Sequence, residues 1–173
     1  MSDGTRYAPE GRIYGIYGAT VFGMQAVERT LKVALIETII IELGQLTSEM
    51  KRSLEYMTLG NMIEKLESLV QPRFTDECGD LRNYVKNRNY VAHQFFLDYV
   101  DAVGDAARDD KAEAFLRLCH RESVLALHRI EALARELRLP EHMAYTERRD
   151  LELMERLKVE PSERIVVRKL QDA

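Results

Sequence analysis

The stretch of sequence that decides the fold runs from Asp80 to Val100 and reads DLRNYVKNRNYVAHQFFLDYV. Its apolar residues recur every three or four positions, which places them on one face of a helix. They are Leu81, Tyr84, Val85, Val91, Ala92, Phe95 and Tyr99. Arg88 falls near the middle of this face, because successive residues are about 100° apart around a helix. A buried charge without a partner costs on the order of several kcal/mol, so Arg88 must meet a counter-charge or a ligand.

A second flank of the same helix is polar. Asn89 and His93 lie one turn apart on it, together with Arg82 and Lys86. Cations next to the aromatic ring of Tyr90 suit a contact with single-stranded RNA, in which cations hold phosphates and rings stack on bases. A solvated basic face is the alternative.

The neighbouring segments are also helical in pattern. Helices are predicted over residues 14–43, from Thr47, over 61–70 after Thr58, and over 108–138, with Thr47 and Thr58 as N-caps. The fold class is therefore all-α, an up-and-down bundle of four to five helices. We divide the chain into a flexible arm (1–12), the bundle (13–140) and a charged C-terminal appendage (141–173). The appendage is predicted to hold a short helix near 147–158 and an extended piece at 165–167.

The first predicted helix is apolar nearly all the way round from Val33 to Ile41. Such a helix is buried on more than one side, within the core or against a second subunit. Glu37 interrupts the apolar run. It is either the counter-charge for Arg88 or a solvent-facing residue.

Composition narrows the class of protein. The 173 residues include 31% charged residues, the net charge is −4 and the mean hydropathy is −0.32, as in one ordinary soluble domain. This balance argues against a broad nucleic-acid-binding surface but allows a local basic cleft. Cys78 and Cys119 have no partners at metal-ligand spacing, and the N-terminus lacks the pattern of a signal peptide. We expect a cytoplasmic protein with no membrane contact.

Several chemical signatures are missing from the sequence. No Glu-x-x-His pair, Gly-rich phosphate loop, nucleophile elbow or Cys-His zinc spacing occurs. No metal and no cofactor are therefore expected. His120 lies near the inward face of the last predicted helix, either as a core-edge histidine or as a catalytic one.

The string RNYVAHQFF, residues 88–96, resembles the hallmark of the HEPN superfamily of all-helical domains, in which an Arg and a polar residue precede a His. The string MTLGNMIEKLESLV, residues 57–70, is similar to an upstream helix in one bacterial branch of that superfamily. The resemblance covers about residues 15–138. It implies a homodimeric, metal-independent endoribonuclease that acts as a toxin or defence component, with an antitoxin or another protein as partner.

The resemblance also implies roles for single residues. His93 would be the general base or acid that helps a ribose 2′-OH attack the adjacent phosphate, Arg88 would bind that phosphate, and Asn89 would orient one of them. Arg82, Lys86 and Tyr90 would contact the RNA. Because Arg88 and His93 are about 140° apart around one helix and about 7.5 Å apart along it, a shared site requires two copies of the chain.

One residue departs from the family pattern. HEPN toxins that are paired with a nucleotidyltransferase carry a Tyr two positions after the His, where it is adenylylated, but this chain has Phe95 there. The alternative function is a non-catalytic binding or dimerisation module. In that hypothesis Arg88, Asn89 and His93 form a structural network or bind a nucleotide, and residues 141–173 dock a partner.

Overall fold

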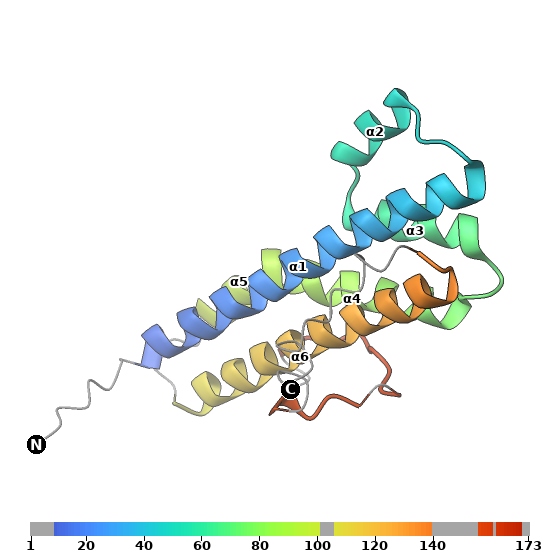
Figure 1. The fold of residues 1–173 in the computed structure, drawn as a ribbon. Helices are drawn as coiled ribbons and strands as arrows, with labels where there is room; N and C mark the ends of the chain where they lie inside the picture. The colour runs from blue at the N-terminus through green and yellow to red at the C-terminus, as the bar shows by residue number, and fades with distance from the viewer. Residues whose placement is uncertain (1–8, 101–105, 140–155, 161, 171–173) are drawn as a thin grey trace, which may run out of the picture.

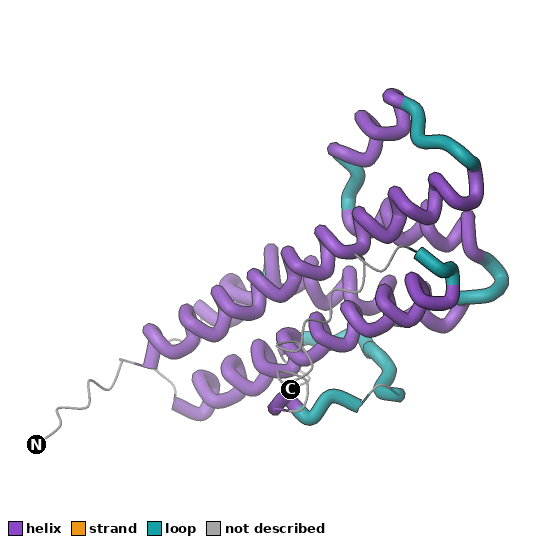
Figure 2. Tube along the Cα trace, in the orientation of Figure 1, coloured by secondary structure: helices purple, strands orange, loops and turns teal. Residues whose placement is uncertain are grey.

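The computed structural model describes residues 9–100, 106–139, 156–160 and 162–170, and in these ranges it contains six helices and no strand (Figures 1 and 2). The helices are α1 (Pro9–Leu43), α2 (Ser48–Glu55), α3 (Leu59–Val70), α4 (Thr75–His93), α5 (Phe95–Val100) and α6 (Ala106–Glu136). The predicted all-α class is confirmed. None of these helices combines the length and the apolar character that a membrane span requires.

The two longest helices, α1 and α6, run parallel and side by side (Figure 1). Their register is visible in two contacts, a salt bridge from Arg12 to Glu113 of 2.8 Å and a hydrogen bond from the Thr20 hydroxyl to the Leu116 carbonyl of 3.2 Å. Helix α4 runs in the opposite direction against α6, and α3 packs on both α1 and α4. The main bundle is thus up-down-up, with α4 between the two long helices in chain order.

Both predicted helix caps are present. The Thr47 hydroxyl accepts a hydrogen bond from the Met50 amide at 3.2 Å, and the Thr58 hydroxyl accepts one from the Asn61 amide at 3.3 Å. Each bond satisfies one of the amides that a helix start leaves without a partner. Helix α1 ends before Gly44, whose φ of 72° is readily adopted only without a side chain.

The helical segment predicted up to Val100, with the acidic residues after Thr75 at its start, is divided into two helices. Helix α4 begins at Thr75 as expected, but the chain is distorted at Gln94, after which α5 begins at Phe95. The hydrogen bonds from the Gln94 amide to the Tyr90 carbonyl (2.8 Å) and from the Asp98 amide to the Gln94 carbonyl (3.1 Å) continue across the distortion. The Tyr90 hydroxyl and the Gln94 amide side chain both bind the Asp98 carboxylate, which holds the two helices together.

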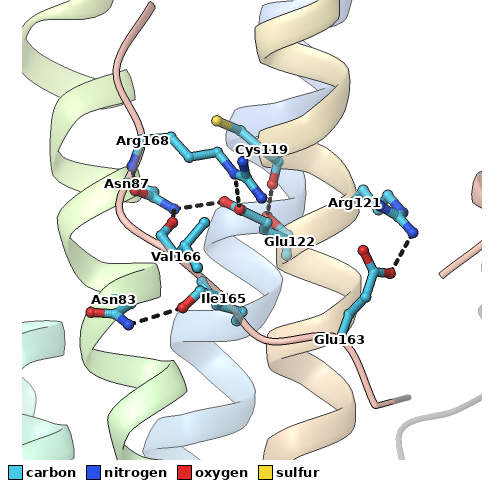
Figure 3. Close-up of polar contacts among 10 residues, drawn as sticks. Asn83, Asn87, Cys119, Arg121, Glu122, Glu163, Ile165, Val166 and Arg168 are labelled. Carbon is cyan, nitrogen blue, oxygen red and sulfur yellow. Dashed lines mark hydrogen bonds and ion pairs between the residues drawn. The ribbon is translucent and has the colours of Figure 1, made fainter. Parts of the chain in front are cut away.

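The chain ends also differ from a simple arm and appendage. Helix α1 starts at Pro9, a residue tolerated in a first helical turn, whereas residues 1–8 of the expected arm lie outside the described ranges. Most of the helix expected near 147–158 lies outside them as well. Residues 157–160 and 162–170, here called the C-terminal segment, lie across α4 and α6 on the side away from α1 (Figure 3). Val159 and Ile165 of this segment are buried.

The core is mainly apolar and contains an aromatic cluster. Phe95 is fully buried at its centre and stacks on Tyr99 and Phe115, with ring centroids 5.8 and 5.9 Å apart. Tyr17 of α1 also stacks on Phe95, with ring centroids 6.0 Å apart. This cluster joins α1, α5 and α6, and it fixes the end of α4 that carries the Arg-Asn-His sequence.

Candidate functional site

The polar flank predicted for α4 is present and exposed. Arg82, Lys86, Asn89 and His93 are all solvent-exposed, and helical spacing places them along one side of α4. We call these four residues the α4 ridge. Their exposure leaves the ridge accessible to a ligand.

Arg88 lies beside the ridge and not in the middle of the buried face. Its side chain is 30% exposed and crosses toward α1, where Nη2 is 3.3 Å from Oε2 of Glu28. Its Nη1 donates to Oδ1 of Asn89 at 3.1 Å. The buried face of α4 is shifted away from Arg88, because the polar residues Asp80 and Asn87 are also buried.

Glu28 is the residue of this site that the sequence did not indicate. The counter-charge considered for Arg88 was Glu37, which is nine positions later in α1 and therefore about 13.5 Å further along the helix. The antiparallel register of α4 against the bundle brings Glu28 to Arg88 instead. In the sequence, Glu28 stands next to Arg29 in a predicted helix, and nothing in that local pattern indicates a contact with a residue 60 positions away.

His93 is the last residue of α4, and Asn89 lies one helical turn before it. The exposed imidazole can exchange protons with a bound ligand, whereas the guanidinium of Arg88 can bind an anion. The helix still separates His93 from Arg88 by about 7.5 Å along its axis. The two residues are also about 140° apart around the helix, so their side chains leave different sides of its C-terminal end.

The three residues predicted to bind substrate do not behave alike. Lys86 is exposed on the ridge, and Arg82 is exposed there too but forms a salt bridge with Glu67 of α3. Tyr90 lies on another flank, where its hydroxyl donates to Asp98 and accepts a hydrogen bond from the Leu170 amide at 3.2 Å. Tyr90 thus contacts the C-terminal segment, not the ridge.

Phe95, the departure from the family pattern, is fully buried in the aromatic cluster. A tyrosine hydroxyl at this position would enter an apolar environment. Tyr99, the next tyrosine along the chain, is also buried, and its hydroxyl donates to Asp109 at 2.6 Å. Neither position offers an accessible hydroxyl beside His93.

His120 is half-buried where α6 packs against α1, and its Nδ1 is buried without a hydrogen-bond partner among the described residues. Burial lowers the pKa of its imidazole, and a hydrogen bond with the backbone of Ala19 opposes that shift. Its Nδ1 lies 3.3 Å from where a side chain would begin at Gly23, so His120 is packed closely against α1. In the part of the chain that the structure describes, no group of three His, Cys, Asp or Glu side chains is placed to hold a metal ion.

A second polar side of α4 escaped the sequence analysis. Asp80, Asn83, Asn87 and Tyr90 follow one another at helical spacing and bind the C-terminal segment. Figure 3 shows the contacts of Asn83 and Asn87. Asp80 and Asn87 are only 1% exposed. In the sequence these residues were indistinguishable from surface polar residues, because their partners are about 80 positions away.

At its C-terminal end, α4 carries an imidazole and an amide on the exposed ridge and the half-buried guanidinium of Arg88 beside them, groups that suit proton transfer and anion binding. The chain matches no protein-family model, no curated protein and no solved structure. Its functional class therefore has to be argued from the ridge and from the resemblance in residues 88–96.

Proposed function

We propose that this protein is a HEPN-like, metal-independent endoribonuclease that acts as a homodimer, as a toxin or defence component. The observation that carries the proposal is the pair of exposed residues Asn89 and His93 at the end of α4, with the half-buried Arg88 hydrogen-bonded to Asn89 beside them. Of these, Arg88 and Asn89 are already hydrogen-bonded to each other, so the guanidinium is held at the edge of the ridge. The resemblance of residues 88–96 to the HEPN hallmark supports the same assignment.

The chemistry needs only the groups on α4. His93 would accept the proton of a ribose 2′-OH while that oxygen attacks the adjacent phosphorus, and the bond to the 5′-oxygen breaks. Arg88 would neutralise the additional negative charge on the phosphate oxygens in the transition state. A proton delivered to the leaving oxygen gives a 5′-OH product, and the other product carries a 2′,3′-cyclic phosphate.

A second copy of the chain is part of the proposal. Arg88 and His93 point in different directions from one helix, so the groups of two ridges facing each other would complete one cleft. Two large apolar side chains are exposed on other helices, Phe22 of α1 at 65% and Leu97 of α5 at 64%. A second subunit that covered such side chains would remove apolar surface from water.

The test compares two forms of one oligonucleotide in EDTA. We expect the protein to cut the RNA strand and to leave intact the same strand with 2′-deoxyriboses, since the attacking hydroxyl is then absent. Mass spectrometry of the fragments should find 2′,3′-cyclic phosphate and 5′-OH ends. Intact RNA under all conditions, or equal cleavage of the deoxy strand, would contradict the proposal.

The salt bridge between Arg88 and Glu28 favours a second candidate, the non-catalytic binding or dimerisation module. Arg88 already has a carboxylate partner, as a residue in a structural network would. In that case the ridge holds subunits together and no RNA is cut.

Glu28→Gln separates the two candidates. If Arg88 binds phosphate, Glu28 competes with the RNA, and its neutralisation should tighten RNA binding by about 2- to 5-fold. The free energy of unfolding should change by less than about 1 kcal/mol, because this ion pair is still partly exposed to water, at 30% for Arg88 and 40% for Glu28. Filter binding and urea denaturation measure the two quantities.

The matched control for this experiment is Glu42→Gln. Glu42 lies on the same helix and forms an exposed salt bridge of 3.2 Å with Arg73. The Glu42→Gln substitution should leave RNA binding unchanged. If Glu28→Gln instead weakens dimerisation without any effect on RNA, the binding-module function is supported.

A further inference from the structure

The C-terminal segment is bound to α4 and α6 in the manner of a peptide ligand. We propose that the face formed by Asp80, Asn83 and Asn87 of α4 and Glu122 of α6 is a recognition site for extended basic peptides. Its ligand has the pattern Arg-aliphatic-x-x-Arg, and residues 164–168 of this chain are the resident, tethered ligand. We call Asp80, Asn83, Asn87 and Glu122 together the docking face.

The side chains of two asparagines form hydrogen bonds with the main chain of the C-terminal segment (Figure 3). The Asn83 amide donates to the Ile165 carbonyl at 2.9 Å, and Asn87 donates to the Val166 carbonyl at 2.8 Å. Asn87 Oδ1 also accepts from the Arg168 amide at 2.8 Å. A side-chain amide that bonds both a carbonyl and an N–H holds an extended backbone whatever its side chains are.

Two buried carboxylates accept hydrogen bonds from the arginines of the C-terminal segment. Glu122 accepts from Arg168 Nε at 2.7 Å, and Asp80 accepts from Arg164 Nε at 2.7 Å. The side chains of Glu122 and Asp80 are only 5% and 2% exposed. Burial raises the pKa of Glu122, and the hydrogen bonds from Arg168 and Asn87 oppose this shift. A ligand that covers these two carboxylates must therefore supply cations, because burying them without a counter-charge is costly.

The remaining positions define the middle of the pattern. Ile165 is 1% exposed, whereas Val166 and Val167 are 46% and 49% exposed. One aliphatic side chain is thus selected, and the two that follow it face solvent. The recognised pattern is therefore Arg164, the aliphatic Ile165, two positions whose side chains are not selected, and Arg168.

The residue before the pattern is also bound. The guanidinium of Arg121 forms a salt bridge with Glu163, and Arg129 Nη2 donates to the Glu163 carbonyl at 2.6 Å. These two basic residues of α6 set the direction in which the segment runs along α4. A ligand with an acidic residue before its first arginine should fit best.

These contacts are local to the segment and would form equally with the same sequence on a separate molecule. The resident copy has the advantage of its tether, which gives it an effective concentration on the order of millimolar. A free peptide must compete with it. Substitutions that weaken the binding of the C-terminal segment to the docking face should therefore increase the apparent affinity for a free peptide. The increase should equal the factor by which the segment's competition lowers that affinity in the wild type.

The experiment uses a fluorescent peptide of residues 162–170, SERIVVRKL, and the full-length protein. Fluorescence polarisation would compare wild type with a variant that carries Ile165→Asp and Arg168→Ala in its own segment. We expect the variant to bind the peptide at least about 10-fold more tightly than wild type. Adding Asn87→Ala to the variant should abolish this gain, and a peptide with both arginines replaced by alanine should not bind.

Equal affinity of wild type and variant, or no binding to either, would overturn the proposal. The milder variant Arg168→Ala keeps the buried Ile165 and serves if the double variant does not fold, as checked by circular dichroism. It should give the same direction of change with a smaller factor. The outcome is independent of ribonuclease activity, because only peptide binding is measured.

Discussion

Replacing His93 with alanine is expected to lower the rate of metal-independent RNA cleavage by about 10²- to 10⁴-fold, the usual contribution of a general acid or base. The physical reason is the loss of the one proton-transfer group on the ridge. The fold should not change, because His93 is exposed at the last position of α4, where substitutions alter the free energy of unfolding by about 0.5 kcal/mol or less. Single-turnover cleavage in EDTA and urea denaturation measure the two effects.

Lys86→Ala is the matched control for this substitution. Lys86 is exposed on the same ridge and can hold a phosphate, but it carries no imidazole. Its loss should weaken RNA binding and reduce the dependence of binding on salt, with little effect on the rate of the chemical step. If the His93 variant cuts RNA as fast as wild type, His93 is not the catalytic group and the ridge is a binding surface.

The parts of the fold that were predicted correctly depend on local chemistry. Thr47 and Thr58 each precede an apolar periodic run, and their hydroxyls bond amides only three residues away. The apolar period of α4 likewise needs no knowledge of the rest of the chain. It placed Asn89 and His93 on one exposed flank, where the structure has them.

The parts that could not be predicted depend on tertiary contacts. The pairing of Arg88 with Glu28 follows from the register between α4 and α1, over 60 positions of sequence. The sequence predicts an RNA contact for Tyr90 because its aromatic ring is next to basic residues. Its hydroxyl instead bonds Asp98 and the amide of Leu170, and the second of these partners comes from the C-terminal segment.

The same segment explains the largest gap in the sequence interpretation. Asp80 and Asn87 interrupt the apolar period of α4, and periodicity assigns such residues to the surface. They are buried because an extended strip of chain covers them and supplies arginines and main-chain groups as partners. The apolar pattern reports which residues avoid water, but it does not report polar residues that are buried with a polar partner.

Replacing Asp80 with alanine is the largest stability change that we expect, a decrease of about 3–5 kcal/mol in the free energy of unfolding. The Asp80 carboxylate lies between Arg129 Nε at 2.9 Å and Arg164 Nε at 2.7 Å. Its side chain is 2% exposed. Removing it would leave the Arg129 guanidinium, only 17% exposed, without this partner and would release one end of the C-terminal segment. Urea denaturation measures both effects, since a released segment should also lower the m-value.

Asp76→Ala is the control that isolates burial as the cause. Asp76 contacts the same Arg164 at 3.3 Å, but its side chain is 81% exposed, so its loss should cost less than about 1 kcal/mol. Asp80→Asn should fall between the two, because the amide keeps an acceptor for one arginine but no charge. If Asp80→Ala is as mild as Asp76→Ala, the desolvation of the buried carboxylate cancels its ion pairs. The docked segment would then be held mainly by the asparagine contacts and Ile165, and the arginines would set which peptide binds without adding to the stability of the fold.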